Sequence, residues 1–212
     1  MTLYCATGNP GKLREFQLAA AGADIQLELP PDYRELPACV EDGATFEENA
    51  VIKAKHYGVH APGLLFADDS GLEVDALGGA PGVYSARYSG PGATDRGNNA
   101  LLLEKLRGVE NRTARFVCAI ALVEGQRLVG TWRGAVEGRI IDEARGSAGF
   151  GYDPLFYHAP FGCTFGEASA EAKLAVSHRG QAMRAMLRAL GAGRQSAGLP
   201  PHGPRTNPSV GH

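Results

Sequence analysis

The chain has no excess of positive charge. Its 212 residues include 21 Lys and Arg, 23 Asp and Glu and 6 His, which leaves a formal net charge of -2. Proteins that bind nucleic acids through their overall charge carry a basic surplus, so we expect no polynucleotide partner. A smaller anion would have to be held by a few focused cations, by backbone N–H groups or by a metal ion.

Long apolar runs are also missing, and we expect no leader segment. The first residues, MTLYCATGNP, contain neither the basic stretch nor the apolar stretch of a secretory signal, and no segment approaches the roughly 18 apolar residues that span a bilayer. The sequence therefore predicts a cytoplasmic protein without a membrane partner. Cysteine is sparse and forms no C-x-x-C pair, so we expect reduced, structural thiols at Cys5, Cys39, Cys118 and Cys163.

What the sequence does contain is an alternation of strand-like and helical segments. Apolar and β-branched runs between Gly-rich turns predict strands at residues 3–6, 25–29, 64–67, 72–76, 115–123 and 128–136. Helical patterns cover residues 10–21, 46–60, 95–106 and 180–190, and Thr45 with Glu48 forms a capping box before the second of them. This order predicts an α/β protein with a mixed sheet, in which the last two strands form an antiparallel hairpin.

The last residues differ in composition from the rest. From Gly191 to His212, glycine, proline and polar residues dominate, and such a segment buries too little apolar surface to offset the entropy lost on ordering. We therefore expect one domain over residues 1–190 and a disordered tail over residues 191–212.

A candidate phosphate site follows the first predicted strand. Asn9 is a favourable N-cap and Pro10 suits the first helical position, so free backbone N–H groups and the positive end of a helix would face beyond the strand. Lys12 adds a positive charge one turn into the helix. A P-loop is excluded, because Leu13 follows the lysine where a hydroxyl is required. The alternative is a turn that uses glycine and proline for geometry alone. The candidate residues are Thr7, Gly8, Asn9, Pro10, Gly11 and Lys12.

Two adjacent carboxylates, Asp68 and Asp69, end an apolar predicted strand. Successive side chains of a strand point to opposite faces, so one of them can reach a cleft while the other supports the loop or meets a metal ion from another side. A carboxylate in a cleft binds Mg²⁺ or takes a proton from an attacking water. Ordinary turn chemistry is the alternative. Glu41 precedes the second predicted helix and Lys53 lies inside it. Taken alone, Glu41 suits a partner of the helix dipole, and Lys53 suits a surface ion pair with Glu47 or Glu48.

Aromatic and basic residues mark two later stretches. Within residues 149–156 aromatic rings alternate with glycines beside Asp153, which suits stacking on a flat base. His178 and Arg179 precede the last predicted helix, where positive charge opposes the helix dipole unless an anion or a base lies nearby. Packed core aromatics and a solvated helix end are the respective alternatives.

Taken together and in this order, the segments TGNPGK, TFEENAVIKA, ADDSGLEVDALGGAPGVYSARYSG, FGYDPLF and SHRG resemble the inosine/xanthosine triphosphate pyrophosphatase family. The resemblance covers residues 3–190, and the combination is far more specific than any single motif. It implies a long central mixed sheet flanked by helices, two lobes that form a nucleotide-binding cleft, and a homodimer. It also implies Mg²⁺-dependent hydrolysis of deaminated purine nucleoside triphosphates (ITP, dITP and XTP) to monophosphate and pyrophosphate, which clears them from the nucleotide pool.

The resemblance also implies roles for individual residues. Asp69 would act as general base on the attacking water and would share Mg²⁺ with Glu41. Phe150 would stack on the base. The remaining substrate-binding residues would be Thr7, Gly8, Asn9, Pro10, Gly11, Lys12 and Lys53 at the triphosphate, Ser70 beside it, Gly151, Tyr152 and Asp153 in the base pocket, and Lys173, His178 and Arg179 at the base or the phosphates.

Elementary chemistry agrees with these roles. Hydrolysis of a phosphoanhydride needs neutralised charge and an aligned water, and it needs no covalent nucleophile. A site that donates to a purine 6-oxo group rejects adenine by leaving polar groups unpaired, whereas guanine would have to be excluded near C2. Two alternatives stand beside this hypothesis. A pyrophosphatase for pyrimidine or modified nucleotides is disfavoured by FGYDP and SHRG, and a nucleotide sensor without turnover is disfavoured by the presence of Asp69 and Lys12.

Overall fold

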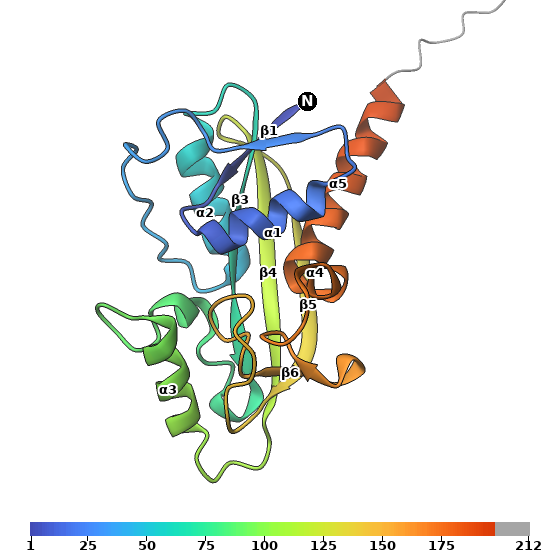
Figure 1. Cartoon of the computed structure of the whole chain (residues 1–212). Coiled ribbons are helices and arrows are strands. Elements are labelled where there is room, and N and C mark those ends of the chain that lie inside the picture. Colours follow the sequence, from blue (N-terminus) through green and yellow to red (C-terminus); the bar gives the residue numbers. More distant parts are fainter. Residues whose placement is uncertain (198–212) are drawn as a thin grey trace, which may run out of the picture.

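A computed structural model describes residues 1–197 of the chain. Seven strands form one sheet in the order β2-β1-β3-β4-β5-β6-β7, and helices lie around it (Figure 1). The strands are β1 (Thr2–Ala6), β2 (Gln26–Glu28), β3 (Leu64–Val74), β4 (Thr113–Glu124), β5 (Arg127–Ile140), β6 (Phe156–His158) and β7 (Cys163–Thr164). The helices are α1 (Pro10–Ala20), α2 (Phe46–Gly58), α3 (Asp95–Lys105), α4 (Ala170–Val176) and α5 (His178–Ala197), with 3-10 turns η1 (Asp75–Leu77), η2 (Gly82–Arg87) and η3 (Ala159–Phe161).

The sheet is mixed, as expected. Strand β1 runs parallel to β2 and β3, and every later pairing from β3 to β7 is antiparallel. The hairpin expected between β4 and β5 is confirmed, and Gly125 at its turn has a φ of 58°, in the left-handed region that favours glycine. Strands β4 and β5 run through both halves of the molecule, with α1, α2 and α5 around the upper half and α3 and β6 in the lower half (Figure 1). The prediction of an α/β fold built on a long mixed sheet is therefore confirmed.

Alternating residues along β3 face different helices. Phe66 packs against Phe16 of α1, with the two ring centroids 5.2 Å apart, in a cluster that also contains residues of α5. Ala67 instead belongs to a cluster with α2. Because side chains alternate along a strand, Asp68 continues the face of Phe66 and Asp69 continues the face of Ala67. The two carboxylates therefore enter different environments, although they are neighbours in the sequence.

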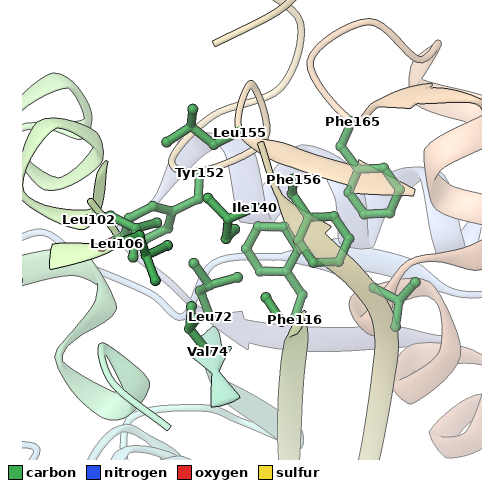
Figure 2. Close-up of a cluster of buried hydrophobic side chains, with 12 residues drawn as sticks. Leu72, Val74, Leu102, Leu106, Phe116, Ile140, Tyr152, Leu155, Phe156 and Phe165 are labelled. Carbon is green, nitrogen blue, oxygen red and sulfur yellow. The ribbon is translucent and has the colours of Figure 1, made fainter. Parts of the chain in front are cut away.

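The lower half has its own hydrophobic core (Figure 2). The rings of Phe116 on β4 and Phe156 on β6 meet there with centroids 4.5 Å apart. Burying a large apolar side chain contributes about 1.5–3 kcal/mol, so this cluster anchors the loop that precedes β6. Its buried members are Leu72, Val74, Leu102, Leu106, Ala114, Phe116, Val136, Ile140, Tyr152, Leu155, Phe156 and Phe165.

The break expected between two strands at residues 68–71 is wrong. Strand β3 continues through these residues, because it pairs with β4 without interruption from Leu64 opposite Glu124 to Val74 opposite Ala114. Gly71 is required within this strand, since a Cβ there would lie 2.6 Å from the carbonyl oxygen of Gly82. The turn η2 can therefore lie directly against β3.

The helix ends match the expected ones only in part. The capping box of α2 is present, with Thr45 accepting from the Glu48 N–H and Glu48 accepting from the Thr45 N–H. The short elements β6, β7 and α4 were not expected. Helix α5 begins at His178 and continues to Ala197, past the end expected at Leu190, because extending an existing helix costs little even through weak helix formers. The rest of the expected tail, residues 198–212, lies outside the described residues.

All 4 cysteines lie within the described residues 1–197 and are free, as expected. Over residues 1–197, no helix combines the length and the apolar character that crossing a bilayer requires.

Candidate active site

A cavity of about 250 Å³ is lined by residues from both halves of the molecule. It lies at the end of β1. The last residue of β1, Ala6, pairs with Ala67 of β3, and from Asp68 onward β3 no longer has β1 beside it. The chain leaves β1 toward β2 on one side, and β3 lies on the other. Such a point, at the carboxyl end of parallel strands, is the usual ligand site of an open α/β sheet. All the predicted site residues line this cavity except Pro10, Gly11 and Lys173.

Two lysines from different helices reach the start of this site. Lys12 of α1 places its Nζ 2.8 Å from an oxygen of Asp68. Lys53 of α2 places its Nζ 2.9 Å from Glu41 and donates to the Asp68 carbonyl oxygen at 2.9 Å. Burial lowers the pKa of Lys53, but the charges of Asp68 and Glu41 outweigh it, so the net shift is upward. Lys53 therefore stays charged, and the expectation of a surface ion pair with Glu47 or Glu48 is wrong.

The N-terminus of α1 is capped as predicted, but its N–H groups are not free. The Asn9 Oδ1 accepts from the N–H of Gly11 at 2.8 Å and from the N–H of Lys12 at 3.0 Å. Thr7 supports this turn through its hydroxyl, which accepts from the Asn9 N–H at 3.2 Å. An anion here would therefore meet the helix dipole and the lysine side chain, with two of the expected N–H donors already satisfied.

Asp69 has no such cationic partner at ion-pair distance within residues 1–197. Its two oxygens accept from the Asn49 side chain at 2.9 Å and from the Ser70 N–H at 2.9 Å. Burial raises the pKa of Asp69, and the opposing charge of Lys12 and hydrogen bond of Asn49 do not cancel the effect. For Asp68, burial also raises the pKa, but the charges of Lys12 and Lys53 outweigh it and the net shift is downward.

The two neighbouring carboxylates thus have opposite pKa shifts. Environments that push the pKa values of paired titratable groups apart indicate different chemical tasks. Asp69 is the stronger base and lines the cavity, whereas Asp68 forms an ion pair with Lys12. The open question from the sequence, which of the two reaches the cleft, is answered by their opposite orientation on β3.

An aromatic ring lies elsewhere in the same cavity. The Phe150 ring has the Lys173 Nζ 5.1 Å and the Arg179 guanidinium carbon 4.9 Å from its centroid. Gly11 does not line the cavity but lies beside this ring, where a Cβ would approach Phe150 to 2.6 Å. Asp153 accepts from the Phe150 N–H at 2.9 Å and also binds the Lys173 ammonium. Lys173 of α4 is therefore linked to the backbone of Phe150 through Asp153.

His178 is buried, and its ring stacks on Phe116 with centroids 4.9 Å apart and planes 13° apart. No described residue is a hydrogen-bond partner of either ring nitrogen. Burial, together with the charges of Arg179 and Lys173, holds the pKa of His178 well below its ordinary value. The imidazole is therefore neutral, with one donor and one acceptor available, and the alternative of a solvated helix end is wrong.

The neutral state of His178 predicts a pH-dependent stability. The unfolded chain binds a proton near the ordinary His pKa of about 6.5 while the folded chain does not, so stability is full above that pH and falls as the pH drops below it. Between pH 6.5 and 5.5 the free energy of unfolding should fall by about 1 kcal/mol from this residue. Urea titrations of the wild type and of His178→Asn measure it: the difference between their pH slopes isolates His178, and equal slopes would contradict the prediction.

Several contributing residues were missed by the sequence analysis. Glu15 of α1 accepts from Lys173 at 2.7 Å and from Arg179 at 2.7 Å. Burial raises the pKa of Glu15, but the charges of Arg179 and Lys173 outweigh it and lower the pKa. The only local signal was its position one turn after Lys12. Asn49, which donates to Asp69, was also missed. So were two residues of α3 that contact Gly151: Asp95 accepts from its N–H at 2.7 Å, and Asn99 donates to its carbonyl oxygen at 3.0 Å. Further missed residues that line the cavity are Ser85, Arg87, Asn98 and Phe116.

The carboxylates of the site suit a metal ion only in part. Within residues 1–197, no group of three or more His, Cys, Asp or Glu side chains comes together as a metal site. Glu41 and Asp69 both line the cavity. Mg²⁺ is often held by one or two carboxylates, with water and substrate phosphates completing its coordination. The two carboxylates therefore fit an ion that arrives with a phosphate ligand and not an ion in an all-protein cage.

The fold and the site define an open-sheet α/β protein whose cleft joins cations and carboxylates to an aromatic ring. The chain belongs to the Ham1 family, whose family model matches residues 3–189, and the resemblance noted in the sequence is confirmed. It is similar to a dITP/XTP pyrophosphatase of Exiguobacterium sp., with 50% identity over 184 residues that cover 87% of this chain and 94% of that protein.

Solved structures agree with this membership. A Ham1 protein from Coxiella burnetii has a TM-score of 0.81 and 38% identity, and the match covers 91% of this chain and 99% of that one. A nucleoside-triphosphatase / dITP/XTP pyrophosphatase from Mycobacterium abscessus has a TM-score of 0.67 and 36% identity, with 94% of this chain and 100% of that one covered.

Proposed function

We propose that this chain hydrolyses deaminated purine nucleoside triphosphates (ITP, dITP and XTP) to the monophosphate and pyrophosphate with Mg²⁺, and so clears them from the nucleotide pool. One observation carries the proposal: two groups of residues line a single cavity. The first group contains Lys12, Lys53, Glu41 and Asp69. The second contains the Phe150 ring and the neutral His178, whose ring nitrogens have no hydrogen-bond partner among the described residues. The first group suits a polyphosphate and the second a flat heterocycle. The names of the relatives described above support the same substrate class.

At the phosphate end, each residue has a separate task. Lys12 and Lys53 neutralise charge on phosphate oxygens, and Asp69 accepts the proton of the attacking water. Asp69 suits this task because its oxygens bind only neutral donors and its pKa is raised. Asp69 and Glu41 would hold Mg²⁺, which supplies further charge stabilisation when bound. The oxygen of the water forms a bond to the α-phosphorus, the α–β phosphoanhydride bond breaks, and pyrophosphate leaves. Because water attacks directly, no covalent nucleophile is needed.

At the other end of the cavity, the purine base would be held by stacking and by hydrogen bonds. Phe150 offers its ring for stacking, and His178 offers one donor and one acceptor to the edge of the base. A donor aimed at a 6-oxo group accepts hypoxanthine and xanthine, whereas adenine would leave buried polar groups unpaired. Gly151, Tyr152 and Asp153 line the pocket around them.

Phe150→Ala should raise the KM for ITP by more than it lowers kcat, because stacking holds the base equally in the ground state and in the transition state. The loss of an aromatic stack corresponds to about 1–3 kcal/mol per base, or a rise in KM of about 5- to 150-fold. Steady-state kinetics measure both constants. Phe161→Ala serves as the matched control, since Phe161 packs in η3 and does not line the cavity. A loss confined to kcat would contradict the stacking role.

The proposed function is tested by the products formed from ITP, dITP, XTP, GTP and ATP, with Mg²⁺ and with a chelator. We expect metal-dependent release of monophosphate and pyrophosphate, with rates on ITP, dITP and XTP at least about 100-fold above ATP, the scale that an unpaired polar group supplies. Equal rates on all substrates would keep the chemistry and reject the selectivity. Orthophosphate release would mean that a different bond is cleaved, and fewer than one turnover per protein molecule would favour the sensor alternative.

The resemblance also supports a wider setting for this activity. We propose a homodimer of a catalytic unit formed by residues 1–190, acting in the cytoplasm without a nucleic-acid or membrane partner. The free cysteines fit a reducing compartment. Sedimentation equilibrium measures the mass in solution, and a monomer over the working concentration range would reject the dimer.

A further inference from the structure

The cations of the cavity differ in how they are neutralised. Within the described residues, the cationic side chains that line the cavity are Lys12, Lys53, Arg87 and Arg179. Three of them already contact a carboxylate: Lys12 contacts Asp68 at 2.8 Å, Lys53 contacts Glu41 at 2.9 Å, and Arg179 contacts Glu15 at 2.7 Å. Arg87 has no carboxylate within the 4.0 Å limit of an ion pair among residues 1–197. Its charge is the least compensated in the cleft.

The backbone around Arg87 is held firmly by a buried side chain. The Asn98 amide of α3 donates to the Ala86 carbonyl oxygen at 3.3 Å, and its oxygen accepts from the Ser89 N–H at 2.8 Å. Asn98 is only 3% exposed. On the other side, the Ser85 hydroxyl accepts from the Leu72 N–H of β3 at 2.9 Å. One asparagine therefore brackets Arg87, so the position of its Cα is set while its side chain is exposed.

An aromatic neighbour orients the guanidinium group without neutralising it. The Arg87 guanidinium carbon lies 5.2 Å from the centroid of the Tyr84 ring, which is 59% exposed. A contact of this kind restricts the rotamers of an arginine and leaves its N–H donors available. Tyr84 and Arg87 both belong to η2, which packs against β3 and α3, whereas Lys12 lies on α1 and Lys53 on α2.

We propose that Arg87 is a substrate-binding residue that contacts the phosphate chain from η2, an element separate from the helices that carry Lys12 and Lys53. The inference rests on the proposed function. A planar guanidinium matches phosphate oxygens with two parallel hydrogen bonds, and it does so without first breaking an ion pair. Lys12 and Lys53, in contrast, already form ion pairs with Asp68 and Glu41. Arg87 thus supplies net positive charge and completes the enclosure of the phosphates.

The test compares Arg87→Gln and Arg87→Lys with the control Arg107→Gln, a nearby exposed arginine just after α3 that does not line the cavity. Calorimetry with inorganic tripolyphosphate in excess Mg²⁺ gives a Kd, inosine serves as a competitive inhibitor, and dITP turnover gives KM and kcat. We expect Arg87→Gln to raise the tripolyphosphate Kd and the dITP KM by about tenfold, with kcat within about threefold and the inosine Ki unchanged. Arg87→Lys should recover part of the loss, and Arg107→Gln should show none.

Two results would overturn the assignment. An unchanged tripolyphosphate Kd in Arg87→Gln would show that Arg87 does not meet the phosphates, and an equal weakening of inosine would place it at the base or the ribose. The calorimetric titration does not depend on turnover. If wild-type protein fails to hydrolyse dITP, the proposed function fails, while the tripolyphosphate Kd still decides the role of Arg87.

Discussion

Asp69→Asn should lower kcat for ITP by at least about 100-fold while substrate still binds, because one side chain supplies both the base and a metal-holding carboxylate. The structure gives the physical reason for choosing this carboxylate. Burial raises the pKa of Asp69, and the hydrogen bond from Asn49 opposes this rise without cancelling it, so the carboxylate can accept a proton. An amide keeps the size of the side chain and cannot accept that proton.

Single-turnover rates and the Kd for ITP, measured separately, distinguish chemistry from binding. Asp24→Asn is the matched control, since Asp24 is exposed and does not line the cavity. It should leave both constants unchanged. If Asp69→Asn retains wild-type turnover, the assignment of the base is wrong; if its Kd rises as much as its rate falls, Asp69 acts mainly in binding.

Lys173→Met should lower the free energy of unfolding by about 3–5 kcal/mol, the cost of leaving buried charges without their partner. Lys173 is 4% exposed and lies between the carboxylates of Glu15 and Asp153. Methionine fills a similar volume but leaves Asp153, itself 2% exposed, without a cation at ion-pair distance within the described residues. For a chain of this size the loss corresponds to a fall in Tm of roughly 6–20 °C.

Two further variants separate charge from packing. Lys105→Met removes an exposed lysine and should leave Tm nearly unchanged. Adding Asp153→Asn to Lys173→Met removes the uncompensated carboxylate and should restore part of the loss. Thermal unfolding followed by circular dichroism measures all three. A fall in Tm that the second substitution does not reduce would assign the effect to lost packing and not to the buried charge.

Local sequence signals determined the main elements of the fold. The capping residues Thr45 and Glu48, the Asn9-Pro10 start of α1 and the Gly125 turn act over a few residues, so their patterns could be read without knowing the rest of the chain. The site residues were also located by motif, because the glycines, carboxylates and aromatic residues gather in short stretches. The break expected at residues 68–71 was wrong because pairing with β4 outweighed the local preference for a turn.

Only the tertiary structure decided how those site residues are partnered. Asp68 and Asp69 have the same local sequence signal, yet their pKa values shift in opposite directions. Burial raises both, but the distant Lys12 and Lys53 outweigh burial at Asp68, whereas at Asp69 the charge of Lys12 and the hydrogen bond from Asn49 do not. Glu15 reaches Lys173 across 158 positions of sequence when α1 lies beside α4 and α5, and no short-range pattern encodes such a contact. The sequence by itself thus determined which residues form the elements and which motifs line the cavity. Packing determined the charge states of the residues in these motifs, because burial and distance in space set the strength of every electrostatic interaction.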